Sequence, residues 1–141
     1  MRAIRLSALT LCVLLGLSSV AAHADIVVIV HPSYPAATLN KADFARLYLG
    51  RTTTFPGGKQ ANAIDLAPGP VREQMLSQLL EKTDSEVAHI WSKLVFSGNA
   101  KSLPRVADEA AMIERVAGDP NAIGYVDAKS VKGSVKVLTL Q

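Results

Sequence analysis

The sequence has 141 residues, 49% of them hydrophobic, and a formal charge of +3 at pH 7. Residues 1–24 distort these figures, because they contain Arg2 and Arg5 without any acid and an apolar run that holds the single cysteine, Cys12. Without them the formal charge is about +1, which argues against a polybasic nucleic-acid-binding protein, and no cysteine remains for a disulfide or a thiolate metal site.

Residues 1–24 have the layout of a secretory signal peptide. The apolar run from Leu6 to Leu17 is too short to span a bilayer, which takes about 20 residues, and Ala22-His23-Ala24 fits an A-x-A cleavage pattern. We therefore predict a periplasmic domain over residues 25–141, with no membrane insertion once the signal is removed. A domain of that length can bury an ordinary apolar core.

The first part of the predicted domain contains two strands and a helix. Ile26 to Val30 is an unbroken run of β-branched residues, which is typical of a central strand covered on both faces. Asn40 is a good N-cap for a helix that ends at Gly50. An extended piece and a turn then lead to a second strand over residues 61–66.

Three more helices and two more strands are predicted in the second part. The helix starts are marked by Pro70, by a capping box of Thr83 and Glu86, and by Asp108 as an N-cap. The strands cover residues 123–126 and 135–140. Strands that alternate with helices predict an α/β fold: a single three-layer-like domain with a mixed sheet flanked by about four helices.

The predicted domain has two histidines, and neither belongs to a recognisable catalytic arrangement. His31 follows the first strand, where α/β sheets place ligands, so it is either a ligand or a loop-packing residue. His89 lies on the polar face of its helix and is interpreted as a solvated surface residue. Because no Ser-His-Asp order, Cys-His pair or metal-spaced cluster accompanies them, we expect no enzyme, no metal site and no cofactor; a hydrolase that uses His31 is a minor alternative.

The segment from Ala67 to Arg72 is the candidate binding site. Here a strand ends, Gly69 precedes a helix, and Arg72 lies in the first turn of that helix. Helix N-termini offer unpaired N–H groups and partial positive charge, and arginine offers paired donors that match phosphate or carboxylate. Two interpretations stay open: an anion site, or an ordinary helix entrance in which Arg72 pairs with Asp65 or Glu73.

Several segments resemble, in order, the periplasmic phosphate-binding proteins. They are Leu39 to Gly50 with Phe55 and Gly57-Gly58, Trp91 to Gly98, and the proline-led Asp119 to Val126. The resemblance covers nearly all of residues 26–138. It implies a type-2 periplasmic-binding fold, in which full-length members have two α/β lobes that close on phosphate and deliver it to an inner-membrane ABC permease.

The chain departs from that family in two ways. It resembles mainly one lobe, and a single lobe cannot enclose an anion between two walls unless another chain or a second copy covers the site. The family's Arg-x-x-Gly-Ser-Gly-Thr phosphate segment falls on residues 65–71, where Asp65 replaces the arginine and both hydroxyls are missing. Pro70-Val71-Arg72 resembles the step that short relatives carry, so Arg72 is expected to stand in for the lost cation.

Together these observations predict a non-enzymatic periplasmic phosphate or oxyanion substrate-binding-like protein, linked to ABC-type phosphate uptake. The predicted anion ligands are Gly69, Val71, Arg72, Ser33 and Thr52. The expected partners are phosphate or another small oxyanion, and an inner-membrane ABC permease or a second lobe or chain; nucleic acid is not among them. The alternative is a periplasmic protein-interaction or sensor-partner module that has lost small-ligand capture, which the missing lobe and Asp65 favour.

Overall fold

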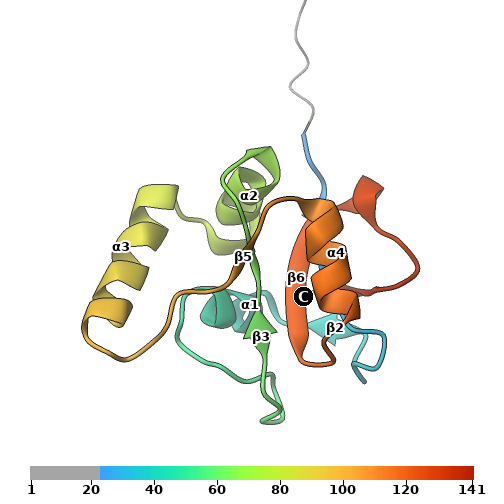
Figure 1. Ribbon diagram of the computed structural model, residues 1–141, viewed down its shortest axis with the longest axis horizontal. Helices are drawn as coiled ribbons and strands as arrows, with labels where there is room; N and C mark the ends of the chain where they lie inside the picture. Colours follow the sequence, from blue (N-terminus) through green and yellow to red (C-terminus); the bar gives the residue numbers. More distant parts are fainter. Residues whose placement is uncertain (1–22) are drawn as a thin grey trace, which may run out of the picture.

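The computed structural model describes residues 23–141, so most of the predicted signal peptide lies outside the described residues. The main sheet has the strand order β2-β7-β1-β6-β3; Figure 1 shows β3 and β6 of this sheet next to each other. Its strands are β1 (Ile26–Val30), β2 (Thr38–Leu39), β3 (Asn62–Ala63), β6 (Ala122–Asp127) and β7 (Lys136–Leu140). A separate parallel pair consists of β4 (Asp65–Leu66) and β5 (Arg105–Val106).

Helices flank both strand groups. They are α1 (Lys41–Tyr48), α2 (Pro70–Met75), α3 (Asp84–Phe96) and α4 (Glu109–Ala117), with the π-helical turn η1 (Leu76–Leu80) continuing α2 and the 3-10 turn η2 (Ala128–Ser130) following β6. The sheet is mixed, because β1 is antiparallel to β6 and β7 while β3 runs parallel to β6 and β2 parallel to β7. The predicted α/β class, mixed sheet and number of helices are confirmed. Among residues 23–141 no helix has the length and apolar character needed to cross a membrane.

β1 is the central strand, as its sequence predicts. It pairs along its whole length with β6, from Ile26 opposite Asp127 to Val30 opposite Ile123, and with β7 on its other edge. The side chains of residues 28–30 are almost completely buried, which explains why this strand has no alternation of polar and apolar residues.

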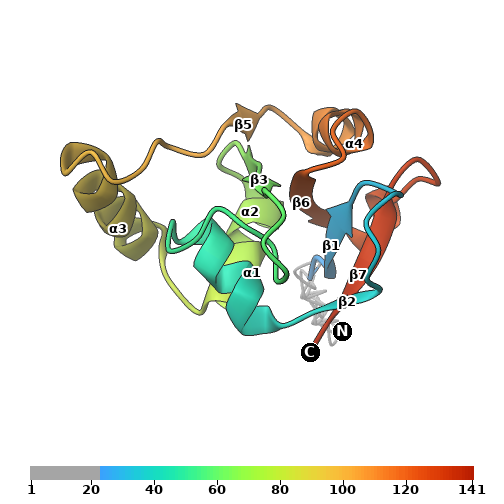
Figure 2. The same cartoon turned by 90° about the horizontal axis from the view of Figure 1, so that it is seen from below.

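α4 packs directly on the sheet, against β6 and β1. Gly124 in β6 allows this close approach, because a Cβ atom there would lie 2.5 Å from Sδ of Met112 in α4. α2 contacts β1 and β6 as well, and Figure 2 shows α1 and α2 on the side of the sheet away from α4. The sheet is therefore covered on both faces.

Two predicted helix starts have the expected caps, and one differs. Thr83 and Glu86 form a capping box, and the Asp108 carboxylate accepts a hydrogen bond from Ala111 N. Asn40 stands at the N-cap of α1, but its side chain makes no capping hydrogen bond. The first helical N–H, of Lys41, instead donates to the carbonyl of Gln141 at 2.9 Å, so the carboxyl-terminal residue takes part in capping this helix.

The predicted strand over residues 61–66 is divided into β3 and β4. Ile64 N still donates to Ile123 O of the main sheet, but Asp65 N donates to Pro104 O and Ala67 N to Val106 O. The chain thus changes partner from β6 to β5 at Asp65. At this point the buried Asp65 carboxylate takes side-chain donors from three elements: Tyr125 on β6, Arg105 on β5 and Arg72 on α2.

Candidate functional site

Asp65 is the centre of a buried polar cluster beside α2. Its Oδ1 accepts hydrogen bonds from the Tyr125 hydroxyl at 2.6 Å and from Leu66 N at 2.9 Å. Its Oδ2 accepts from Nε of Arg72 at 3.0 Å and lies 3.4 Å from Nε of Arg105. A carboxylate away from water needs such donors to remain charged, so the four groups together stabilise a buried negative charge.

Arg72 joins this inner carboxylate to an outer one. Its Nε donates to Asp65, and its Nη1 donates to Oδ1 of Asp84 at 2.5 Å. Burial lowers the pKa of Arg72, but the hydrogen bond to Asp84 and the charge of Asp65 raise it overall, so the guanidinium stays charged. In return, the hydrogen bond from Arg72 holds the pKa of Asp84 below its ordinary value.

The two carboxylates differ greatly in their exposure to water. The side chain of Asp65 is 10% exposed, whereas that of Asp84 is 67% exposed. Asp65 lies on β4 under the start of α2, and Asp84 is the first residue of α3 at the surface. Nε of Arg72 is therefore bonded to a buried carboxylate, Asp65, and its Nη1 is bonded to an exposed one, Asp84.

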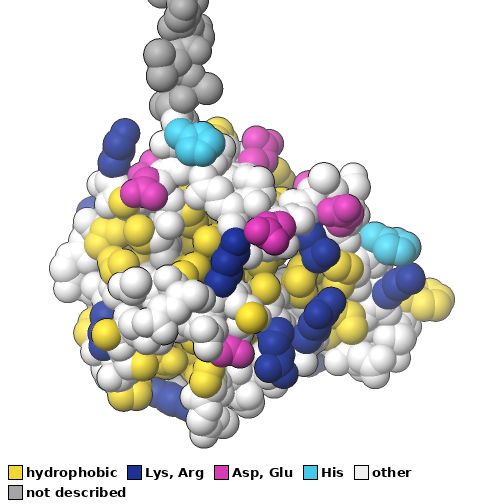
Figure 3. Space-filling view, turned by 180° about the vertical axis from the view of Figure 1, so that it is seen from behind, with side chains coloured by type: hydrophobic (Ala, Val, Ile, Leu, Met, Phe, Trp, Pro, Cys, Tyr) yellow, Lys and Arg dark blue, Asp and Glu magenta, His cyan; other side chains and the backbone are white. Residues whose placement is uncertain are grey.

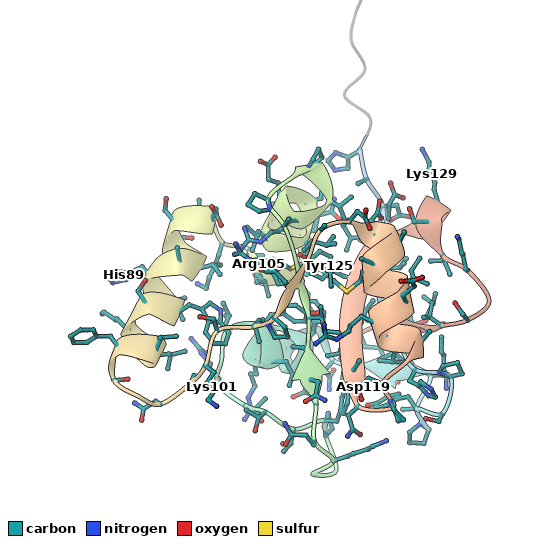
Figure 4. All side chains as sticks on the ribbon, viewed as in Figure 1. His89, Lys101, Arg105, Asp119, Tyr125 and Lys129 are labelled. Atoms are coloured by element: carbon teal, nitrogen blue, oxygen red, sulfur yellow. The ribbon has the colours of Figure 1, made fainter. Side chains whose placement is uncertain are left out.

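Tyr125 links the cluster to the main sheet. Burial, and then the charge of Asp65, raise the pKa of this phenol well above its ordinary value, so it remains protonated and donates to the carboxylate. Its oxygen also accepts from Leu66 N at 3.1 Å. Arg105 on β5 and Tyr125 on β6, labelled in Figure 4, both bond the Asp65 carboxylate. The cluster is thus held by both strand groups.

A cavity of about 380 Å³ lies beside the cluster, between α2, η1 and α3. Its polar end contains Asp65, Arg72, Asp84 and Arg105, and the rest is mainly apolar. Figure 3 shows a surface on which hydrophobic side chains lie exposed between charged ones. At the polar end of the cavity Asp84 is the exposed partner, whereas the Arg72 side chain that it covers is only 5% exposed.

The predicted ligands fall into two groups. Gly69, Val71 and Arg72 share the entrance of α2, with Gly69 at its N-cap. Ser33 hydrogen-bonds His31 in the loop after β1, and Thr52 hydrogen-bonds Thr54. The structure does not bring these last two together with Arg72.

The topology explains this separation. β1 is antiparallel to β6, so β1 ends beside Ile123, at the start of β6, and the loop with Ser33 lies at this end of the sheet. β3 is parallel to β6, so the chain runs from this end through β3 and β4 toward the other end, where α2 begins. Thr53 O accepts from Ala61 N just before β3, which puts Thr52 at the same end as Ser33. The five predicted ligands therefore do not lie together: three share the entrance of α2, and Ser33 and Thr52 lie at the other end of the sheet.

Thr52 instead lines a second cavity, of about 550 Å³. Its other polar lining residues include Asn62, Lys101, Arg115 and Asp119. The Asp119 carboxylate accepts hydrogen bonds from the Asn62 side chain and from Asn121 N, each at 2.9 Å, and these bonds lower the pKa of Asp119.

The histidines lie apart from the Asp65 cluster. Nδ1 of His31 contacts the Ser33 hydroxyl at 2.7 Å and accepts from Ser33 N at 3.1 Å, which is the loop-packing arrangement. His89 is exposed on α3, as expected (Figure 4). Over residues 23–141 no three His, Cys, Asp or Glu side chains are grouped so that they could hold a metal ion.

The sequence left open whether Arg72 pairs with Asp65 or with Glu73, and the structure shows the pair with Asp65. Three further members of the cluster were not predicted. Asp84 has the ordinary signature of a helix start, so its contact with Arg72, 12 positions earlier, has no local signal. Arg105 and Tyr125 reach Asp65 across 40 and 60 positions of sequence. One signal was available in the sequence: Tyr125 carries a hydroxyl in a strand of otherwise apolar residues, and a buried hydroxyl needs a hydrogen-bond partner.

Comparisons with known proteins identify the fold. No family model matches the sequence, and no curated protein matches it either. Among solved structures, the chain is similar to an ABC-type phosphate transport receptor from Vibrio cholerae, with 19% identity and a TM-score of 0.67 over 83% of this chain and 46% of that one.

Two further structures give the same result. A putative phosphate ABC transporter substrate-binding protein with bound phosphate from Clostridium perfringens has 17% identity and a TM-score of 0.63, over 83% of this chain and 45% of that one. PstS from Borrelia burgdorferi has 15% identity and a TM-score of 0.65, over 84% and 47%. The fold is that of one lobe of these periplasmic-binding structures, and the chain spans less than half of their length.

Proposed function

We propose that the chain is a phosphate-binding-type lobe of the periplasm that recognises phosphate or another small oxyanion at the entrance of α2. The likeness to solved phosphate-binding structures supports this class of ligand. Those neighbours are substrate-binding proteins and not enzymes, which supports a non-enzymatic role. Export by residues 1–24 and a link to ABC-type phosphate uptake, through a permease or a second lobe, belong to the same proposal.

The observation that carries the proposal is the contact between Arg72 and Asp84. Nη1 of Arg72 already donates to the oxygen of an exposed carboxylate, which is itself an oxyanion. Asp65 holds Nε from the other side, so the guanidinium edge keeps its orientation. Phosphate oxygens accept hydrogen bonds from arginine in the same geometry as carboxylate oxygens.

The start of α2 adds donors to this arginine. Gly69 is the N-cap, in an extended conformation, and Pro70 follows it without an N–H. The N–H of Val71 belongs to the first turn, where helical geometry provides no intrahelical acceptor. Val71 N is thus a donor left free by the helix, one residue before Arg72 in the chain, and within residues 23–141 a Cβ atom added at Gly69 would meet nothing within 4 Å.

Phosphate titration followed by backbone amide NMR tests the proposal. We expect saturable shifts at Gly69 and Val71 in the purified protein, and the same shifts in Arg46→Gln, which removes an exposed arginine of another ion pair. Arg72→Gln should abolish them. Because this variant loses buried ion pairs, its signal dispersion is checked first, and chloride at equal ionic strength serves as a second control on the wild type. Absence of shifts at this segment up to about 50 mM phosphate, a concentration that would reveal even millimolar binding, overturns the proposal.

A protein-interaction or sensor-partner module is the second candidate. It is favoured by the charge balance of the cluster, in which Asp65 and Asp84 already neutralise Arg72 and Arg105, and by an apolar surface at the end of α3. There Phe96 is 96% exposed and Val95 43%. Exposed apolar residues in a group mark contact surfaces more often than isolated ones do. No phosphate response, together with a crosslinked periplasmic complex that Phe96→Ser abolishes, would favour this candidate.

A further inference from the structure

We infer that Asp84 is a built-in competitor for the anion: its carboxylate occupies the Nη1 edge of Arg72, and phosphate binds there by displacing it. The inference rests on the proposed function, because it concerns the same arginine. It adds a residue that sets the affinity of the site and that the sequence offers no reason to select.

Of the two carboxylates on Arg72, only Asp84 can be exchanged at low cost. Asp65 is buried and accepts from Tyr125, Leu66 N and Arg72, so its removal from the arginine would leave a charge in the protein interior. The Asp84 side chain is 67% exposed, and water replaces Arg72 around it when it turns away. An incoming anion therefore competes with Asp84 and leaves the contact with Asp65 in place.

The surroundings of Asp84 allow this movement. The helix that carries it, α3, has a single fully buried residue, Val87, so a small shift of its first turn does not disturb the main core. The capping box of Thr83 and Glu86 keeps the helix start intact without the Asp84 side chain. A displaced Asp84 carboxylate also stays in the first turn of α3, where negative charge is favourable.

Charge balance gives the direction of the effect. With Asp84 present, the two aspartates of the cluster balance the two arginines, and the net charge is close to zero. Replacing Asp84 by a neutral residue frees Nη1 and leaves the cluster with one positive charge in excess. Both changes favour an anion, so the variant should bind phosphate more tightly. A residue with a merely structural role would give the opposite result, a loss of binding.

The test compares phosphate dissociation constants for four proteins, measured from the Gly69 and Val71 amide shifts. Asp84→Asn removes the competing charge. Asp84→Ser does the same and keeps a side chain that suits a helix start. Asp43→Asn is the matched control, because it removes one negative charge from an ion pair with Arg46 on another helix. The wild type is the reference.

We expect both Asp84 variants to bind phosphate about tenfold more tightly than the wild type, which corresponds to about 1.4 kcal/mol, and Asp43→Asn to stay within about twofold. Equal binding by all four proteins would overturn the inference and leave the proposed function standing. The same gain in Asp43→Asn would also overturn it, since net charge alone would then explain the effect. Binding by none of the four would overturn the proposed function and the inference with it.

Discussion

The sheet with α4 and the side of the molecule that carries α3 are built in different ways. In the first region Ile29, Ile123 and Met112 are fully buried, and Gly124 brings α4 close to the strands. In the second region α3 stands at the edge of the molecule, as Figure 2 shows, with one buried residue and a cavity of about 380 Å³ along it. Binding functions commonly use the less tightly packed part of a fold, and the Arg72 cluster lies where the two regions meet.

The largest effect is expected at Asp65, which joins the two regions. Asp65→Ala leaves Arg72 buried with one carboxylate less and takes the acceptor from the Tyr125 hydroxyl. We expect the free energy of unfolding to fall by about 3–5 kcal/mol, measured by urea denaturation. As a control, Asp43→Ala removes a partly buried carboxylate of a surface ion pair with Arg46 and should change it by no more than about 1 kcal/mol. A loss below about 1 kcal/mol at Asp65 would mean that the cluster does not hold the regions together.

A pair of core substitutions compares the regions directly. Met112→Ala, between α4 and β6, should lower the free energy of unfolding by about 2–5 kcal/mol, because it leaves a cavity in a closely packed core. Ile90→Ala on α3 removes a side chain that is only partly buried, so we expect a loss smaller by at least about 1 kcal/mol. Equal losses in urea denaturation would contradict the described difference in packing.

The outer ion pair should contribute less, and its contribution should depend on pH. Arg72 lowers the pKa of Asp84 from its ordinary value of 3.8, so the pair stabilises the fold above that pH and loses its effect as the pH falls through the lowered value. Because Asp84 is exposed, the contribution at pH 7 is at most about 1 kcal/mol. The difference in unfolding free energy between wild type and Asp84→Asn should therefore shrink toward pH 2. If the difference in unfolding free energy stayed constant over this pH range, the charge of Asp84 would not be its cause.

The smallest effect on stability is expected at the exposed end of α3. Phe96 is 96% exposed, so Phe96→Ser should change the free energy of unfolding by no more than about 0.5 kcal/mol, measured by the same urea denaturation. A larger loss would indicate that Phe96 packs against a second chain in solution. This end of α3 would then not be loosely packed.

Local patterns in the sequence predicted most of the elements. The β-branched run of β1 and the capping box of Thr83 and Glu86 are confirmed because each depends on residues close together in the chain. The division of residues 61–66 at Asp65 was missed, since it follows from partners on β5 and β6 that no nearby residue reveals.

The candidate site was predicted in part for the same reason. Gly69 and Arg72 lie within four positions, so their proximity follows from helix geometry. Ser33 and Thr52 were assigned to the same anion without knowledge of strand directions, and the opposite directions of β1 and β3 relative to β6 separate them from it. Asp84 reaches Arg72 through the turn after η1, where Glu81 has a left-handed backbone conformation (φ 54°).

A crystal structure of Asp84→Asn grown with phosphate shows whether an anion binds Arg72. We expect an anion that accepts a hydrogen bond from Nη1 of Arg72, in the place of the Asp84 carboxylate, while Nε of Arg72 stays bonded to Asp65. Arsenate, which has the same shape and an anomalous signal, would confirm the identity of the anion at that position. Phosphate bound elsewhere on the protein, with Arg72 and its surroundings unchanged and without an anion, would contradict the account.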